Sequence, residues 1–192
     1  MKGVVFNLLE DVVSRHYGAD VWDQLLEASE LDGAYTSLGS YPDEDLERLV
    51  ASACAALGLS RSAVLKWFGV QAMGSLAQLY PAFFERHAKT RPFILSVNSI
   101  IHPEVRKLYA GAGCPHFHFT EFGETLVMDY RSSRRLCALA EGFVEGASAH
   151  YGEAVVFEHH KCVETGDDSC VFHIRWPVMA GAAADMDLAD AP

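Results

Sequence analysis

Three cysteines and a histidine in the C-terminal part of the chain could together hold a metal ion: Cys137, His159, Cys162 and Cys170. Three thiolates and an imidazole make a tetrahedral ligand set that suits zinc, and four protein ligands leave no open position for catalysis. His160 competes with His159, but neighbouring residues of a strand point to opposite faces. The spacing is not that of a common zinc finger, so a disulfide between Cys162 and Cys170, or free thiols, are alternative interpretations.

A second candidate ligand is His102, in the partly helical segment 98–109, NSIIHPEVRKLY. A neutral imidazole can bind iron. A single histidine beside Ile100 and Ile101 is also typical of a protein core, and the segment on its own favours that interpretation. Pro103 removes a backbone hydrogen bond and disfavours helical angles at its predecessor. We therefore expect either a kink at His102 or a helix that restarts with Pro103 at its first position.

Tyr130, Ser132 and Arg134 form a Tyr-x-Ser-x-Arg triplet. In an extended backbone, alternate side chains project to one face, where two hydroxyls and a guanidinium fork would bind carboxylates. The alternative is a solvated strand edge followed by a helix start at Ser133, which the spacing alone favours.

The elements that position these residues divide into a helical first half and a mixed second half. Apolar periodicity and end signals predict helices from the N-terminus to Gly18, over about 20–30 and 42–57, from a cap at Ser60 to Gly69, and over 74–87 with a break or kink at Pro81. Alternation predicts strands around Phe117 and Phe119 and over 124–131, a helix over 136–151, and a strand pair over 154–159 and 170–176. The predicted class is α+β: a helical lobe, about 1–62, packed on a lobe of antiparallel strands and helices, about 63–178. Residues 179–192 are predicted to be a disordered tail.

Composition limits the function. The 192 residues are half apolar, enough for a sizeable core. A net charge of −11 argues against binding nucleic acid or an anionic membrane. The chain shows neither an apolar run of bilayer length nor a signal-peptide cleavage site, so we expect a soluble cytoplasmic protein. Five cysteines in a reducing compartment indicate buried thiols or metal ligands. No paired carboxylates or Ser-His-Asp arrangement suggests an enzyme, and the acidic stretch 43–47 is typical of a solvated helix face.

The combination of a helix-rich half containing His102, strands after it, and the Tyr130-x-Ser132-x-Arg134 triplet resembles the haem nitric oxide/oxygen binding family, H-NOX, which is related to the haem domain of soluble guanylate cyclase. The resemblance extends from the N-terminal Met-Lys-Gly to Trp176. It implies that His102 is the axial ligand of a haem that lies between the lobes and that the triplet binds the haem propionates. No Cys-x-x-Cys-His is present, so the haem would be non-covalent haem b.

The resemblance assigns further residues. Pro115 matches the proline that presses on the porphyrin and distorts it. The four thiol and imidazole residues match the zinc site of a proteobacterial subgroup, which would be structural. Positions that carry a tyrosine and its supporting residues in oxygen-binding members are Leu139, Leu9 and Ala72 here, and none is a hydrogen-bond donor. The chain therefore resembles the branch that binds nitric oxide and carbon monoxide but not dioxygen, unless a donor such as Tyr80 or His150 reaches the site.

These features predict a gas sensor without catalytic activity. Nitric oxide at five-coordinate ferrous haem would break the bond between iron and His102, and the change would pass to a separate protein. The resemblance suggests a histidine kinase or a cyclic-di-GMP enzyme as that partner. One alternative is a zinc-binding regulatory module of the V4R type, which takes small organic ligands and has no haem. A second is an enzyme or electron carrier that uses haem for redox chemistry.

Overall fold

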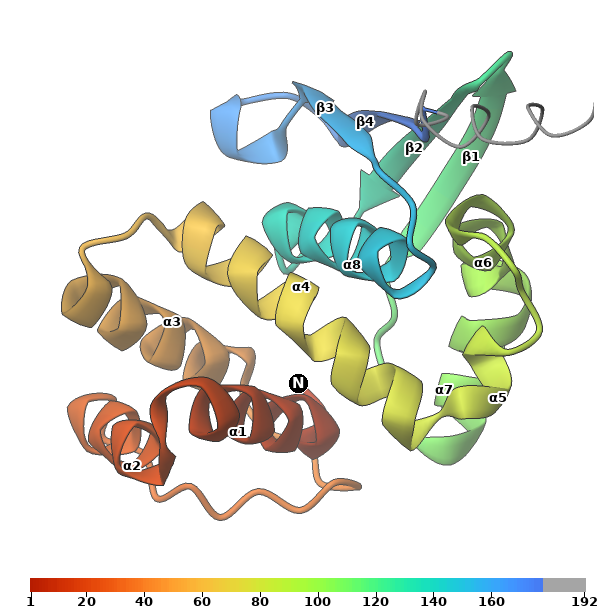
Figure 1. The fold of residues 1–192 in the computed structure, drawn as a ribbon. Coiled ribbons are helices and arrows are strands. Elements are labelled where there is room, and N and C mark those ends of the chain that lie inside the picture. Colours follow the sequence, from red (N-terminus) through yellow and green to blue (C-terminus); the bar gives the residue numbers. More distant parts are fainter. Residues whose placement is uncertain (178–192) are drawn as a thin grey trace, which may run out of the picture.

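Four helices come first in the computed structural model, which describes residues 1–177 (Figure 1). They are α1 (Gly3–Tyr17), α2 (Ala19–Ala28), α3 (Asp43–Leu57) and α4 (Arg61–Leu79). The predicted end signals are confirmed: Gly58 adopts a left-handed φ of 65° after α3, and the Ser60 hydroxyl accepts a hydrogen bond from the Ala63 amide at 3.2 Å. These signals fix the start of the long helix α4.

The predicted stop at Gly69 is wrong, because α4 continues through Gly69 and Gly74 to Leu79. Gly69 instead allows close packing against α8 (Cys137–His150): a Cβ there would lie 2.6 Å from the Leu139 carbonyl oxygen. A Cβ at Gly142 would lie 2.2 Å from the Lys66 carbonyl oxygen. The missing side chains let the two helices pack backbone to backbone at the centre of the molecule (Figure 1).

Three short helices follow α4: α5 (Pro81–Phe84), α6 (Thr90–Ser96) and α7 (His102–Leu108). The expected break at Pro81 is confirmed, but the predicted helix over 74–87 is instead the end of α4 followed by α5. A π-helical turn, η1 (Val97–Ile101), joins α6 to α7. The backbone stays helical from α6 through η1 into α7, and Pro103 is the second residue of α7, so the expected restart with Pro103 at the first position does not occur. His102 keeps helical angles, φ −62° and ψ −38°.

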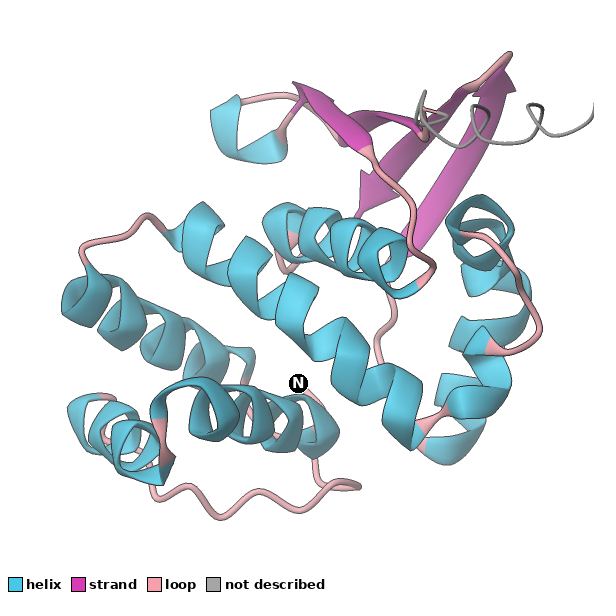
Figure 2. Cartoon of the chain, in the orientation of Figure 1, coloured by secondary structure: helices cyan, strands magenta, loops and turns pink. Residues whose placement is uncertain are grey.

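Four strands form one antiparallel sheet in the order β1-β2-β4-β3, drawn in magenta in Figure 2. They are β1 (His116–Phe122), β2 (Thr125–Arg131), β3 (Val156–Lys161) and β4 (Cys170–Arg175), with a 3₁₀ turn, η2 (Val163–Thr165), between β3 and β4. One face of the sheet packs on α8, where Met128 and Phe172 meet Val144 in one apolar cluster. The predicted α+β class is confirmed.

The buried apolar side chains form two clusters. The first joins α1 to α4 with the start of α8, and the second joins the sheet, α5, α6 and the rest of α8. Leu76 and Phe143 pack against both clusters.

Within residues 1–177 no single helix is long and apolar enough to cross a membrane. Helices α3 and α4 together have the length and composition of a membrane span, but the pair is bent by 105°. The predicted tail, 179–192, lies outside the described residues.

Candidate functional site

His102 is half-buried, and its ring stacks at 5.7 Å between centroids on Phe117 of β1. Its Nδ1 atom is buried and has no hydrogen-bond partner among residues 1–177. Burial, helped by the nearby charges of Arg106 and His116, lowers the pKa of His102 to about 4. The imidazole is therefore neutral at physiological pH, which is the form that binds a metal ion.

The π-helical turn before His102 is anchored to the sheet by Asn98. Its side-chain amide donates to the Phe117 carbonyl oxygen, and its own oxygen accepts from the Phe117 amide at 3.4 Å. These two hydrogen bonds resemble those between the backbones of neighbouring strands. They hold η1 beside β1, whose Phe117 ring stacks on His102. Single π-helical turns are frequent at functional sites, and this one sets the position of the imidazole. The sequence offered no periodic signal for Asn98.

The triplet was expected to have an extended backbone throughout, and this expectation is wrong. Strand β2 ends at Arg131, and the Ser132 hydroxyl accepts from the Arg134 amide at 3.3 Å, which closes a local turn. Serine two residues before an amide commonly stabilises such a turn. Tyr130 is only 3 % exposed, and burial raises the pKa of its hydroxyl despite polar contacts with Ser132 and the Leu136 backbone. The helix begins at Cys137 rather than at Ser133.

Arg134 already binds a carboxylate. Its Nε donates to Asp43 Oδ2 at 2.7 Å, and its Nη1 donates to the Gly113 carbonyl oxygen at 2.6 Å. The other Asp43 oxygen accepts from the amino group of Met1 at 2.6 Å. Burial works to raise the pKa of Asp43, but the bonds from the Met1 amino group and Arg134 outweigh it, so that pKa is lowered. Arg134 lies beside a depression that Met1, Asp43 and Leu136 also line.

The interpretation of 43–47 as a solvated acidic face is wrong at Asp45, which is buried, whereas Asp43 and Glu47 keep exposed side chains and form ion pairs. Asp43 pairs with Arg134, Asp45 is only 8 % exposed and pairs with Arg48, and Glu47 pairs with Arg61. Asp43 and Arg134 are 91 residues apart, so no local pattern indicated their contact.

Leu9, Ala72 and Leu139 all belong to the first apolar cluster and are at most 9 % exposed. The two donors considered as alternatives bond or pack elsewhere. The Tyr80 hydroxyl lies 2.6 Å from that of Tyr109, and the His150 ring packs on Phe84 and Tyr151. His102 does not join the three residues: its neighbours Ile101 and Phe117 pack against the second cluster.

The four predicted zinc ligands are brought together. One ligand atom from each of Cys137, His159, Cys162 and Cys170 lies within 4.8 Å of all the others, and these four are called the thiol cluster below. The sulfurs of Cys137 and Cys162 are 3.8 Å apart. That is about the edge of a tetrahedron with Zn–S bonds of ~2.3 Å. All five cysteines are free thiols, so the structure contradicts the disulfide alternative.

Burial raises the pKa of Cys137 and of Cys170, and the neighbouring sulfurs add to the shift of Cys137. Without a metal ion these groups are protonated thiols, whereas a bound cation would hold them as thiolates. His159 packs on Phe172 with ring centroids 4.3 Å apart, and burial lowers its pKa, which keeps its ring neutral. The donor set therefore fits zinc.

The loop of the thiol cluster is tightly built. The Cys162 amide donates to an Asp167 carboxylate oxygen at 2.8 Å, and the Cys162 carbonyl accepts from the amides of Thr165 and Asp167, both at 3.1 Å. Gly166, with φ of 104°, makes the turn possible. The loop thus holds the Cys162 sulfur in place without help from a ligand.

Arg61, the first residue of α4, connects the loop of the thiol cluster to α3. Its guanidinium donates to Glu47 of α3 at 2.6 Å, to Glu164 of η2 at 2.7 Å and to the Arg135 carbonyl oxygen at 3.2 Å. One side chain therefore joins α3, the turn after the triplet, and the thiol-cluster loop.

Pro115 is half-buried directly before β1, two residues after the Gly113 carbonyl that binds Arg134.

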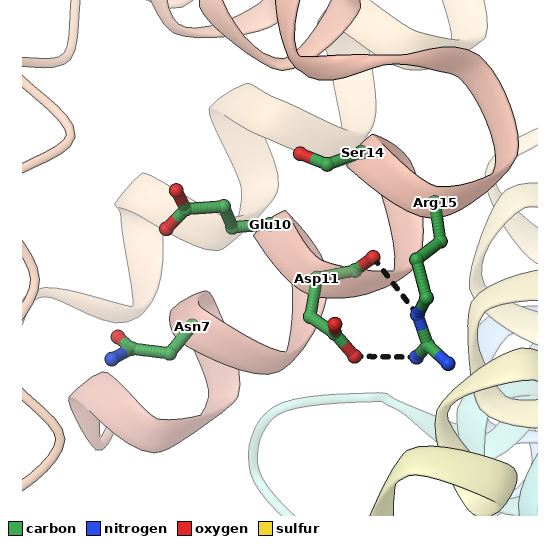
Figure 3. Close-up of a pocket in the computed structure, with 5 residues that line it drawn as sticks. All are labelled: Asn7, Glu10, Asp11, Ser14 and Arg15. Carbon is green, nitrogen blue, oxygen red and sulfur yellow. Dashed lines mark hydrogen bonds and ion pairs between the residues drawn. The ribbon is translucent and has the colours of Figure 1, made fainter.

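A shallow depression on α1 is lined by Asn7, Glu10, Asp11, Ser14 and Arg15 (Figure 3). There Arg15 pairs with Asp11, whose carboxylate also accepts from Ser75 of α4 at 2.9 Å. No imidazole or thiol lines this depression.

Comparison with known proteins gives a consistent result. A sequence model of the family described as Haem-NO-binding matches residues 2–159. The H-NOX protein from S. oneidensis, solved in the Fe(II)NO ligation state, is 31 % identical over 93 % of this chain and all of its own, with a TM-score of 0.87. The H-NOX domain from Shewanella oneidensis in the Fe(II)CO state is 32 % identical over 92 % of this chain and 99 % of its own, with a TM-score of 0.84. An unliganded Fe(II) H-NOX protein from K. algicida is 26 % identical over 95 % of this chain and all of its own, with a TM-score of 0.81.

Proposed function

Since the chain belongs to the Haem-NO-binding (H-NOX) family, we propose that it is a cytoplasmic, non-catalytic sensor that binds nitric oxide at a five-coordinate ferrous haem b. His102 would be the axial ligand, and the haem would lie between the helical lobe, about 1–62, and the remainder, about 63–178. The observation that carries the proposal is the half-buried neutral imidazole of His102, whose Nδ1 has no hydrogen-bond partner in the described part of the chain. Membership of a haem-binding family also argues against the V4R-type alternative, because a V4R-type module has no haem.

The residues present fit a haem. When bound, the haem supplies a ferrous iron that binds diatomic gases. His102 offers the neutral imidazole, and Arg134 offers a guanidinium that already holds the Asp43 carboxylate at 2.7 Å beside a depression. Tyr130 and Ser132 would add hydroxyl donors to the propionates. We assign to Pro115 the distorting contact with the porphyrin.

Arg134 and Arg131 provide a matched test of propionate binding. Arg131 is the last residue of β2, shortly before the turn that holds Arg134; it is fully exposed and pairs only with Asp129 among the described residues. We expect Arg134→Gln to speed haem transfer to a scavenging globin at least tenfold, and Arg131→Gln to leave the transfer rate unchanged. Equal rates for both variants would remove Arg134 from the haem site.

Leu9, Ala72 and Leu139 support selectivity against dioxygen. A donor over the iron stabilises bound dioxygen, whereas an apolar surface does not. The three side chains are apolar and buried, and both alternative donors, Tyr80 and His150, are engaged elsewhere. We therefore propose that nitric oxide and carbon monoxide bind and dioxygen does not.

The signal would arise at His102. Nitric oxide would free His102 from the iron, and the segment 97–108 would then change its position relative to β1, to which Asn98 ties it. A ligand shifts an equilibrium only by its differential affinity for two states, so the iron–imidazole bond must distinguish the two. We propose that a separate protein, a histidine kinase or a cyclic-di-GMP enzyme, reads the change. The thiol cluster would hold a structural zinc ion. This ion would keep the β3–β4 hairpin fixed while the segment 97–108 moves.

Replacing His102 by Gly and adding imidazole tests this role. Free imidazole would bind the iron without a covalent link to α7, so we expect the partner's activity to become independent of nitric oxide. Full nitric oxide dependence in His102→Gly with imidazole would show that the signal does not pass through His102. The wild-type protein with added imidazole is the control.

A further inference from the structure

Three side chains on the outer face of the sheet, away from α8, gather as a second possible ligand set: Glu158 and His160 of β3 and His173 of β4. One ligand atom of each lies within 4.8 Å of the other two. We propose that this outer-face cluster is a second metal site, distinct from the thiol cluster, that takes a divalent transition-metal ion such as zinc. The inference does not depend on the proposed gas-sensing function.

The backbone builds the cluster from strand pairing and one irregularity. Glu158 and His173 are direct partners across the antiparallel pair β3–β4. The register then shifts between His159 and Lys161, which leaves His160 as an extra residue opposite the partner strand. Such bulges commonly re-aim a side chain. Here the His160 ring lies beside that of His173, with centroids 3.9 Å apart.

Two adjacent histidines of β3 belong to different clusters. His159 joins the thiol cluster on one side of β3, and His160 joins the outer-face cluster on the other. The expectation that they point to opposite faces is thus confirmed. His173 becomes a ligand candidate only because β4 pairs with β3.

The carboxylate of Glu158 is oriented by a neighbour. Arg175 Nη2 donates to Glu158 Oε1 at 2.8 Å, while Glu158 Oε2 faces His160 Nε2 at 3.4 Å. One oxygen is therefore fixed by a charged partner and the other is directed at the imidazole. Outer partners that orient ligating carboxylates in this way are typical of metal sites.

The ligand types define the class of ion. Two imidazoles and a carboxylate suit zinc, nickel or copper, whereas calcium and magnesium prefer oxygen ligands. The side chains of Glu158 and His160 are 44 % and 48 % exposed, so an ion can enter from solvent. Three protein ligands leave coordination positions open for water or a further group. The bound ion would join β3 to β4 on the face opposite the thiol cluster.

Zinc counting on the haem-loaded full chain tests the proposal. After dialysis against buffered free Zn²⁺ in the low micromolar range, we expect two zinc ions per wild-type chain by elemental analysis. His173→Ala and Glu158→Gln should each retain one, and Glu158→Gln keeps the shape of the side chain if the alanine variant unfolds. Cys162→Ser should also retain one, because it damages only the thiol cluster.

His118→Ala is the matched control, since His118 is an exposed histidine of β1 on the same face and lies outside the cluster. It should retain two zinc ions. A wild-type chain that takes up no more zinc than His173→Ala and Glu158→Gln, or an equal loss in His118→Ala, would overturn the proposal. Any of these results leaves the haem assignment untouched.

Discussion

The thiol cluster and the His102 segment, residues 97–108, are candidate metal-binding regions built in opposite ways. Four ligands of the thiol cluster converge from α8, β3, β4 and the loop between the strands, and Cys137 and Cys170 are at most 2 % exposed. The His102 segment supplies one ligand from a π-helical turn and a short helix, and neither η1 nor α7 has a buried residue.

From this difference we expect the thiol cluster to be rigid and the His102 segment to be movable. Segments with few buried contacts open at a lower free energy than packed ones, and elements that move on ligand binding come from that class. Asn98 and the Phe117 stack hold the His102 segment through a small number of contacts. The thiol cluster, in contrast, is held by the sheet, α8 and its own loop, which agrees with the structural role proposed for zinc and the responsive role proposed for His102.

The largest effects should come from removing one ligand in each region. We expect His102→Ala to abolish axial ligation of the haem and leave zinc content unchanged. Cys170→Ser should abolish zinc binding at the thiol cluster and preserve the haem spectrum. Zinc analysis and the absorption spectrum of both variants check this independence. Loss of haem in Cys170→Ser, with the helical content unchanged, would show that the two regions are not separate.

Gly142 and Gly74 test the packing of α4 on α8. A Cβ at Gly142 would lie 2.2 Å from a backbone oxygen, so we expect Gly142→Ala to destabilise the fold by about 1–3 kcal/mol through overpacking. A Cβ at Gly74 meets nothing within 4 Å. Gly74→Ala should stabilise the fold by roughly 0.5–1 kcal/mol, because alanine is the better helix former. Urea unfolding gives both values, and similar destabilisation by both variants would contradict the packing described here.

Arg61 should have a smaller effect, since exposed ion pairs contribute about 0–1 kcal/mol each. Arg61→Gln removes the contacts to Glu47 and Glu164 and should increase hydrogen exchange in residues 162–167. Arg48→Gln removes only a pair within α3, to Asp45, and should leave exchange there unchanged. If both variants affect the loop equally, Arg61 does not connect it to the helices.

The smallest expected effect concerns pH. A histidine with a pKa near 6.5 loses about tenfold in metal affinity per pH unit below that value, because the proton competes with the metal. The pKa of His102 is about 4 in the haem-free fold. Its neutral form therefore persists as the pH falls from 7.5 to 5.5, and we expect haem affinity to change little over that range. A tenfold loss between pH 6.5 and 5.5, measured by haem transfer, would show that His102 is more easily protonated than its burial indicates.

Local chemistry was predictable from the sequence, and distant pairings were not. The cap at Ser60, the left-handed Gly58 and the opposite directions of His159 and His160 follow from rules that act within a few residues. The thiol cluster was also predicted, because a hairpin brings Cys162 and Cys170 together and few other residues could complete a tetrahedral set.

Three features required the structure. Asp43 meets Arg134 across 91 residues, and a helical acidic run looks the same whether it is solvated or paired. Gly69 was predicted to end a helix because glycine usually weakens one, but close packing against α8 requires it there. Ser132 closes a turn with the Arg134 amide, which alternation alone does not reveal.

The most direct test of the central claim is the absorption spectrum of the anaerobically reduced, haem-loaded protein, before and after nitric oxide and then in air. The account predicts a five-coordinate ferrous spectrum, its conversion by nitric oxide to a five-coordinate nitrosyl spectrum, and no stable oxy spectrum. These results would confirm ligation by His102, its release and an apolar distal side together. A protein that binds no haem, or one that forms a stable oxy complex, would contradict the account.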